Sequence, residues 1–332
     1  MNILYLSCHS ILEYLETKLF TEMGHQVFSF GSYINSWHPH DNKRPGYEGF
    51  YSHKLITLAG KCTQENLDQK LINWADVVIV MHKPEWIINN WQKMKGKTVV
   101  WRTIGQSVPE IEGLLSLSRK EGLKIVRYSP RERAIPGFIG EDTLIRFYVD
   151  EEEFTGFTGE NPVVITVVQS MKNRLNYCNW DVFEKVTSGF NRSVYGPGNE
   201  NVAGNAGILS YEDLKKAYRT NRVFVYTGTY PASYTLGFIE AMMTGIPVVA
   251  IGERLADIRL YPMQTYEVDK IIKHKENGIC SENINELRDL ISSLLTDIND
   301  AKRIGEAGRK TAIELFSKKV IKPQWEAFFK TL

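Results

Sequence analysis

Cysteine is scarce in this chain of 332 residues, which contains only four: Cys8, Cys62, Cys178 and Cys280. They lie far apart and form no C-x-x-C pair, so they provide neither a disulfide framework nor a cysteine-based zinc site. A reducing compartment is the simplest setting for such cysteine usage. We therefore expect a cytoplasmic protein.

The chain also lacks an excess of charge and a long apolar run. Forty basic and 39 acidic residues leave a net charge of +1, which does not support a general surface for binding polyanions. Residues 1–7 have no basic leader, and their apolar run is too short for a signal peptide or a membrane span. We expect a first β-strand there, no transmembrane segment, and at most peripheral contact with a membrane.

Hydrophobic residues make up 43% of the chain and charged residues 24%, which is typical of a globular protein with a sizeable core. Apolar runs typical of strands alternate with helical patterns along both halves, which predicts parallel sheets covered by helices on both faces. The helical pattern of the first half is clearest at 11–23. The predicted strands are 3–6, 26–30, 77–81, 98–101, 124–128, 163–168, 192–195, 222–226 and 247–251.

This alternation predicts an α/β chain with two doubly wound, Rossmann-like domains facing a cleft. Residues 150–162, with three acidic residues in a row and several glycine and proline breaks, are the predicted hinge. The predicted domains are 1–155, for the acceptor side, and 156–311, for the nucleotide-sugar. Residues 312–332 are predicted to form a C-terminal helix that crosses back to the first domain.

The segment from Thr227 to Gly252 has the order of an anion-binding unit: a strand, a polar turn, a helix and a second strand. Gly245 stands where the helix should end in a left-handed conformation, and Pro247 cannot continue the helix. Backbone N–H groups at the helix start would favour a phosphate. These are the N–H groups of Tyr234, Thr235 and Leu236. A strand, turn and helix also occur in any buried α/β unit, so this pattern alone favours a ligand site only modestly.

The same segment resembles the donor site of retaining GT-B glycosyltransferases, the group typified by glycogen and sucrose synthases and bacterial mannosyltransferases. That family has Pro-Ser-x-x-Glu-Gly-x-Gly-Leu, then Glu-Ala-Met, then Gly-x-Pro-Val-Val. Here Glu240-Ala-Met and Gly245-Ile-Pro-Val-Val match. By this resemblance the chain is identified as a divergent member of glycosyltransferase family 4.

The resemblance implies that Glu240 binds the ribose of a nucleotide-sugar. The family's first glutamate, which holds hydroxyls of the transferred sugar, falls on Ala232, and its two glycines fall on Ser233 and Thr235. Side chains that could replace the missing glutamate are those of Thr229, Tyr230, Ser233 and Thr235.

Other parts of the chain agree with the resemblance. Residues 143–154 are similar to the family's link between domains, and 195–199 with 207–214 to the turns that flank the nucleoside. The family's Arg-x4-Lys pair on the diphosphate aligns with Gln169 and Arg174, and Lys172 lies between them. Two positive charges therefore remain near the expected phosphate.

The implied function is transfer of a sugar from a nucleotide-sugar to an acceptor hydroxyl, with retention and without a metal or a further cofactor. Negative charge grows on the departing diphosphate; Arg174, Lys172 and the helix start at 233–236 would stabilise it. The resemblance implies a front-face mechanism in which the leaving phosphate helps to deprotonate the acceptor. The sequence leaves open whether the nucleotide is UDP, GDP or ADP, and whether the acceptor is a glycan, a lipid-linked glycan or a small molecule.

In the first half, loops after the apolar strands are further candidates, because doubly wound sheets bind ligands at the carboxyl ends of their strands. These loops are Ser7-Cys-His-Ser10, His82-Lys-Pro84, 102–107 and 127–133. The family's glycine pair after the first strand and histidine after the strand ending at Trp101 are absent. His9, Arg102 or Gln106 are our candidates for positioning the sugar, although a lone histidine at a strand end is more often structural.

Between Gly31 and Ser52 the regular pattern fails and aromatic residues gather, including Tyr33, Trp37 and Tyr47. Long ordered loops are often functional, and aromatic faces stack on sugars or bases. This loop is our candidate for the acceptor site; an aromatic flap that only shields the cleft is as good an interpretation. His38-x-His40-Asp41 is a weak metal pattern, and we expect no metal there.

Two alternatives remain. The missing glutamate at position 232 is also compatible with an inactive GT-B module that binds a nucleotide. A third hypothesis is a phage-type enzyme that glycosylates a hydroxymethylated DNA base. Its phosphate track would be Arg119, Lys120, Arg127, Arg131 and Arg133. We favour the interpretation of these residues as a solvated face with local ion pairs.

Overall fold

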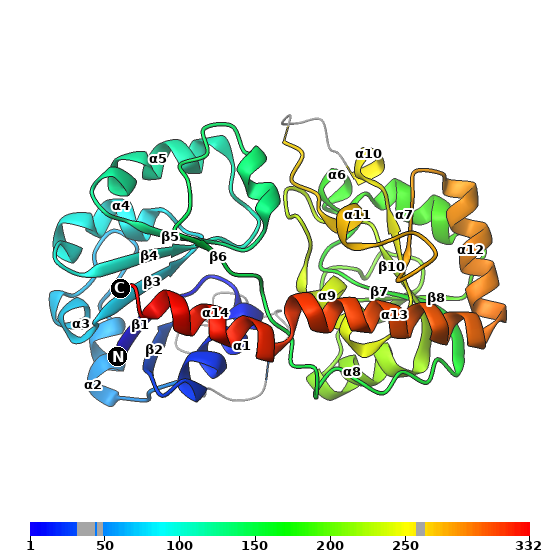
Figure 1. The fold of residues 1–332 in the computed structure, drawn as a ribbon, viewed down its shortest axis with the longest axis horizontal. Coiled ribbons are helices and arrows are strands. Elements are labelled where there is room, and N and C mark those ends of the chain that lie inside the picture. The colour runs from blue at the N-terminus through cyan, green and yellow to red at the C-terminus, as the bar shows by residue number, and fades with distance from the viewer. Residues whose placement is uncertain (32–43, 45–48, 257–262) are drawn as a thin grey trace. The chain divides into compact units, whose positions relative to one another are not determined.

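The structure is a computed structural model that describes all residues except 32–43, 45–48 and 257–262. The chain divides into two compact units, drawn in Figure 1. The first unit contains residues 1–146 and 322–332, and the second contains residues 147–321. The predicted boundaries at 155 and 311 stay predictions.

The described part of the first unit contains a parallel six-stranded sheet in the order β2-β1-β3-β4-β5-β6. All five side chains of the central β3, Val-Val-Ile-Val-Met, are buried, as expected for a strand that helices cover on both faces. The strands are β1 (Asn2–Leu6), β2 (Gln26–Phe30), β3 (Val77–Met81), β4 (Thr98–Arg102), β5 (Lys124–Arg127) and β6 (Thr143–Leu144).

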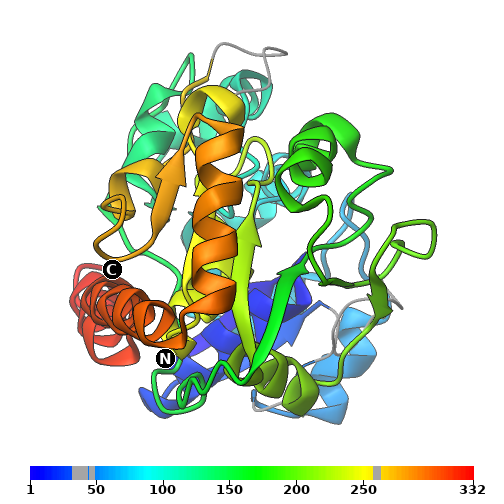
Figure 2. The ribbon, with the colours of Figure 1, turned by 90° about the vertical axis from the view of Figure 1, so that its right-hand side faces the viewer.

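Helices lie on both faces of this sheet (Figure 1). Figure 2 turns the view so that the second unit faces the reader. They are α1 (Ser10–Glu22), α2 (His53–Ala59), α3 (Gln69–Trp74), α4 (Glu85–Asn90) and α5 (Pro109–Lys120), with 3-10 turns η1 (Trp91–Met94) and η2 (Pro130–Ala134). The C-terminal residues complete the core of this unit, because the rings of Trp325 and Phe329 pack edge-on against Phe20 of α1 at 4.8 and 5.2 Å.

The second unit has its own parallel six-stranded sheet among the described residues, in the order β12-β11-β10-β7-β8-β9. The chain moves outward from β7 to β9, then returns to β10 beside β7 and continues the other way. The strands are β7 (Asn161–Val167), β8 (Arg192–Tyr195), β9 (Asn205–Gly207), β10 (Asn221–Tyr226), β11 (Val248–Ile251) and β12 (Ile279–Ser281).

Helix α9 (Leu236–Thr244) follows β10 and is almost completely buried. It ends as predicted, because Gly245 takes the left-handed conformation with φ +92° and Pro247 follows. The other helices are α6 (Leu175–Cys178), α7 (Trp180–Thr187), α8 (Tyr211–Thr220), α10 (Glu253–Ala256), α11 (Val268–Ile271), α12 (Ile284–Thr296) and α13 (Ile298–Phe316). Helix α14 (Lys318–Phe329) begins in this unit and continues in the first, which contains residues 322–332.

The predicted strands agree with the observed ones to within about two residues at each end. The prediction missed the short edge strands β6, β9 and β12. None of the helices in the described part of the chain is both long and apolar enough to cross a bilayer.

Candidate functional site

The strand order of the second unit places a topological switch point between β7 and β10. Open parallel sheets bind ligands outside the carboxyl ends of the strands that flank such a point. Two segments begin there. We call residues 168–179 the post-β7 segment and residues 227–235 the post-β10 turn.

Hydrogen bonds join these two segments. The Asn179 side-chain amide donates to the carbonyl of Thr227 at 2.8 Å, and the Thr227 hydroxyl donates to the carbonyl of Cys178 at 2.7 Å. The backbone N–H of Tyr230 donates to the carbonyl of Tyr177 at 2.7 Å. The structure therefore brings together two groups of predicted site residues that lie more than fifty positions apart in the sequence.

The post-β7 segment carries the predicted positive charges. Gln169 and Lys172 are exposed and Arg174 is half-buried, with its Nη1 atom 3.4 Å from the carbonyl oxygen of Gln169. Burial raises the pKa of the Cys178 thiol, and the Arg174 charge opposes that rise, so the guanidinium lies close to the base of this segment. Arg174 is thus a cation at the switch point that makes a weak hydrogen bond to the backbone.

The segment is held in place by a buried side chain from the turn after β8. Asn199 is fully buried; its amide donates to the carbonyls of Val168 and Gly196, and its Oδ1 atom accepts from the N–H of Met171. Gly196 has φ +125°, and a Cβ atom there would lie 2.3 Å from the Val168 carbonyl oxygen. Only glycine fits at this position, so the turn after β8 can pack directly on the post-β7 segment.

The start of α9 lies at the other side of the switch point. Thr235 is the N-cap residue and makes no side-chain cap hydrogen bond, which leaves the first turn of the helix without that partner. Ser233, Tyr234 and Leu236 are buried. The Tyr234 ring packs against Phe316 and Phe238.

Glu240 lies one turn further along α9. Its side chain is 3% exposed, and its Oε2 atom accepts a hydrogen bond from the Tyr218 hydroxyl at 3.4 Å. A carboxylate has several lone pairs and can accept more than one hydrogen bond.

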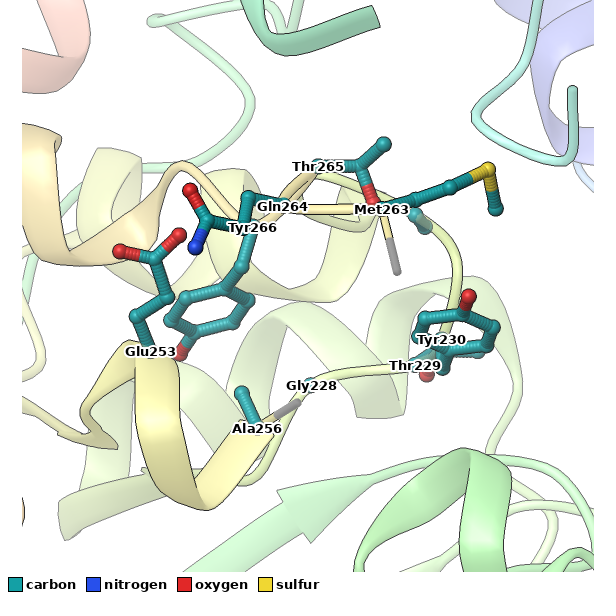
Figure 3. A pocket seen from close by; sticks show the side chains of 10 residues that line it. Gly228, Thr229, Tyr230, Glu253, Ala256, Met263, Gln264, Thr265 and Tyr266 are labelled. Atoms are coloured by element: carbon teal, nitrogen blue, oxygen red, sulfur yellow. The ribbon is translucent and has the colours of Figure 1, made fainter. Parts of the chain in front are cut away.

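A pocket lies beside the post-β10 turn (Figure 3). It is a small hollow that is partly open to solvent. Thr229 and Tyr230, both predicted site residues, line it, and Ala232 lines it too. The sequence reasoning missed the other wall: Glu253, Ala256, Met263, Gln264, Thr265 and Tyr266. No local motif marks those residues, because they follow a different strand.

In the first unit, two predicted catalytic residues, His9 and Arg102, form hydrogen bonds within the protein. His9 is the N-cap of α1, where its Nδ1 atom accepts from the N–H of Leu12 at 3.4 Å. Arg102 is fully buried; it pairs with Glu16 at 2.8 Å and donates to the carbonyl of Ile145 at 2.6 Å. These contacts give both side chains a structural role that needs no ligand. The catalytic roles of His9 and Arg102 stay predictions.

His82, which the sequence suggested only as part of a strand-end loop, is more unusual. It follows β3 in a left-handed conformation with φ +60°, which is rare for a residue other than glycine. Its Nδ1 atom is buried and has no hydrogen-bond partner among the described residues. Burial, together with the nearby Lys83 and His9, lowers the pKa of the imidazole to about 4. Such strain and burial cluster at functional sites.

Other predicted residues lie outside the described part of the chain or form ion pairs within the protein. Most of the aromatic loop, including Trp37 and the His38-x-His40 pattern, is not among the described residues. In the proposed phosphate track, Arg127 is fully buried against Glu112, and Arg119 and Arg133 pair with Asp142 and Glu141. Lys120 is exposed and Arg131 is half-buried.

Comparison with known proteins agrees with this geometry. Residues 198–311 match the family model described as glycosyl transferases group 1. No curated protein sequence is a significant match.

Solved structures resemble the whole chain. A sucrose-phosphate synthase (tll1590) from Thermosynechococcus elongatus has a TM-score of 0.67 at 15% identity, over 100% of this chain and 98% of that one. Anabaena Alr3699/HepE in complex with UDP-glucose has a TM-score of 0.69 at 13% identity, over 100% of both chains. An alpha-glucosyltransferase in complex with UDP and DNA containing an HMU base has a TM-score of 0.63 at 12% identity, over 98% of both.

At these identities the structural likeness establishes the fold, which is GT-B, with two units that each contain a parallel six-stranded sheet. The family match covers the part of the second unit that contains the post-β10 turn, Glu240 and the pocket residues. The comparisons therefore show a GT-B fold for the chain and, within residues 198–311, a match to the group 1 glycosyl transferase model.

Proposed function

We propose that this protein is a group 1 glycosyltransferase that moves a sugar from a nucleotide-sugar to an acceptor hydroxyl, with retention at the anomeric carbon and without a metal ion. The observation that carries the proposal is the switch point between β7 and β10. There the uncapped start of α9 lies on a turn that is hydrogen-bonded to the segment bearing Arg174. Both features attract a diphosphate.

In this proposal the diphosphate lies against the N–H groups at the start of α9, and Arg174 and Lys172 stand beside it. As the bond to the sugar breaks, the anomeric carbon gains oxocarbenium character and the leaving oxygen gains negative charge. Fixed cations and oriented N–H groups stabilise that charge more in the transition state than in the ground state.

Glu240 accepts hydrogen bonds from the ribose, and Thr229 and Tyr230 contact the sugar. The leaving phosphate takes the proton of the acceptor hydroxyl, which attacks on the same face. We assign no chemical step to His9 or Arg102, because the contacts of both side chains are structural.

A donor screen tests the proposal. The protein is incubated with labelled UDP-, GDP- and ADP-sugars, in the presence and absence of EDTA, and release of nucleoside diphosphate is measured. UDP-sugars are the first choice, because Anabaena Alr3699/HepE is described in complex with UDP-glucose. We expect release that EDTA does not abolish, and NMR of the product should show the donor's anomeric configuration. A protein that gains thermal stability from these compounds yet releases nothing would instead be the inactive binding module.

A DNA base is the second candidate acceptor, and one comparison favours it: the alpha-glucosyltransferase in complex with DNA shares the fold over nearly its whole length. The structure supports it less, because Arg127 is buried and Arg119 and Arg133 form local ion pairs. Binding to a duplex that contains hydroxymethylated bases should fall steeply with salt if this acceptor is correct. We rank a small or lipid-linked glycan acceptor above it.

A further inference from the structure

The turn after β8 packs on the start of the post-β7 segment. We call residues 196–199, Gly-Pro-Gly-Asn, the post-β8 turn. Its last residue, Asn199, is fully buried. The Asn199 amide donates to the Val168 carbonyl at 2.7 Å, and its Oδ1 atom accepts from the N–H of Met171 at 2.9 Å. One buried side chain thus binds the backbone at both ends of the stretch 168–171.

Ser170, within this stretch, has a strained backbone that the post-β8 turn holds. Its φ is +46°, in the left-handed region that residues with a Cβ atom rarely adopt. Such strain persists only where the surrounding structure enforces it. Here the N–H of Ser170 donates to the carbonyl of Pro197 at 2.8 Å. A Cβ atom at Gly198 would lie 2.1 Å from the Ser170 hydroxyl oxygen, so a side chain there would displace Ser170.

Both the backbone and the side chain of Arg174 are hydrogen-bonded to the same stretch. The Arg174 N–H donates to the Ser170 carbonyl at 2.9 Å, and its Nη1 atom donates to the Gln169 carbonyl at 3.4 Å. The directions of these two carbonyls depend on the backbone dihedral angles of the stretch 168–171, which the post-β8 turn restricts. Asn199 therefore influences the position of the guanidinium without touching it.

From these contacts we infer that Asn199 is a positioning residue, which holds Arg174 in the place where the guanidinium binds the diphosphate of the donor. The inference rests on the proposed function and deepens it. A side chain that is already ordered loses less conformational entropy when a ligand binds, so preorganisation raises affinity. Loss of the Asn199 contacts should therefore weaken binding of a diphosphate, but only while Arg174 is present.

A double-mutant cycle tests the inference. Affinity is measured by calorimetry with UDP, GDP and ADP, and the compound that the parent binds most tightly is used for every variant. Asn199→Ala and Arg174→Ala should each weaken binding about tenfold. The double variant should also weaken binding about tenfold, rather than about a hundredfold, because Asn199 acts through the guanidinium.

Asn277→Ala is the matched control. Asn277 is also buried in the second unit and precedes the edge strand β12. Its amide donates to the Ile271 carbonyl and the Thr311 hydroxyl, and its Oδ1 atom accepts from the N–H of Lys273. The control therefore removes as many hydrogen bonds as Asn199→Ala does. It should lower the thermal midpoint but change the affinity less than about twofold.

Gly198→Ala is a second probe, which keeps the test decisive if Asn199→Ala does not fold. It displaces Ser170 but leaves the Asn199 side chain in place. Gly189→Ala is its control, because φ is +83° at Gly189 and +74° at Gly198, while a Cβ atom at Gly189 meets no described residue within 4 Å. Gly198→Ala should weaken binding about tenfold while Arg174 is present, and Gly189→Ala less than about twofold.

A direct contact of the post-β8 turn with the nucleoside would give a different result. Asn199→Ala would then weaken binding equally with and without Arg174, and that outcome overturns the inference. An effect no larger than that of Asn277→Ala overturns it as well. A parent that binds none of the three compounds would overturn both the inference and the proposed function. The expected coupling without release of nucleoside diphosphate from a sugar donor would overturn only the proposed function.

Discussion

Arg127 and Glu112 form a bidentate ion pair in which both side chains are fully buried. The Nη1 and Nη2 atoms of Arg127 donate to the two carboxylate oxygens of Glu112 at 2.6 and 2.8 Å. The guanidinium also lies over the rings of Trp101 and Phe138. Strand β5 and helix α5 are thereby joined in the first unit, and Arg127 is not available to a phosphate backbone.

Glu112→Ala should therefore destabilise the first unit strongly. It would leave a buried guanidinium without its counter-charge, which costs about 3–5 kcal/mol of unfolding free energy. Urea unfolding followed by tryptophan fluorescence measures this, because Trp180 is the only one of seven tryptophans outside the first unit. The double variant Glu112→Leu/Arg127→Met should recover most of the loss. A single variant as stable as the parent would contradict a structural role for the pair.

Arg174→Ala should reduce turnover far more than stability. Loss of one group that stabilises the leaving charge typically lowers kcat by about 10²–10³. Among the described residues, the guanidinium makes only the 3.4 Å hydrogen bond with the Gln169 carbonyl, so the free energy of unfolding should change by less than about 0.5 kcal/mol. Arg303→Ala, on an exposed arginine that pairs with Asp300, is the control. Equal activity of the Arg174 and Arg303 variants would remove Arg174 from the mechanism.

Glu240→Gln should weaken binding of a nucleoside diphosphate about tenfold, because a hydrogen bond to a charged acceptor contributes about 1.5–3 kcal/mol. The amide oxygen can still accept from the Tyr218 hydroxyl, so that the fold should be kept. Calorimetry with UDP and with 2′,3′-dideoxy-UDP checks the assignment. The parent protein and the variant should bind the dideoxy compound equally; an equal loss for both ligands would mean that Glu240 does not contact the ribose.

His82→Leu should lower kcat/KM about tenfold, the cost of one lost hydrogen bond to a substrate in a buried site. Leucine is also disfavoured at φ +60°, whereas asparagine tolerates this conformation and keeps a polar atom near the position of Nδ1. His82→Asn should therefore stay close to the parent activity. Thermal midpoints of both variants separate this effect from unfolding. If the two variants lose activity equally, the Nδ1 atom has no part in binding.

Glu132 should make the stability of the first unit depend on pH. Burial raises the pKa of its carboxyl to about 7, although Arg127 and the Thr103 hydroxyl oppose the rise. Because the folded pKa lies above the unfolded one, the stability that the neutral acid contributes is complete below about pH 4.5 and is lost as pH rises through 7. The difference in unfolding free energy between the parent and Glu132→Gln should change by about 3 kcal/mol across that window. A constant difference would refute the assignment.

The strands were predictable wherever the apolar run is continuous. All five residues of β3 and all four of β11 are buried, as expected for strands of a parallel sheet that helices cover on both faces. The edge strands β9 and β12 were not predictable, because each has only three residues and the Asn205–Gly207 strand has no buried side chain. Such strands exist because they pair with β8 and β11, and that pairing is a property of the folded sheet.

Part of the candidate site was likewise predictable from the sequence, and part was not. The post-β10 turn, the α9 start and Glu240 lie in one short stretch of sequence. Gly245 and Pro247 mark the end of the helix within that same stretch. The wall formed by Glu253 and Gln264 follows another strand, and it meets the post-β10 turn only in the folded unit. His82 was visible as a strand-end histidine, but its backbone strain and its burial were not.

The sequence by itself determined the order of strands and helices and the strand, turn and helix at the donor segment, because these depend on periodicity and on turn residues within a few positions. Only the tertiary structure decided which charged side chains are available to a ligand. Arg102 pairs with Glu16, 86 positions away, and Arg127 pairs with Glu112, 15 positions away. Arg174 lies at the switch point, where its guanidinium makes a weak hydrogen bond to the Gln169 carbonyl. Burial of a charge requires a partner, and the fold chooses that partner through space.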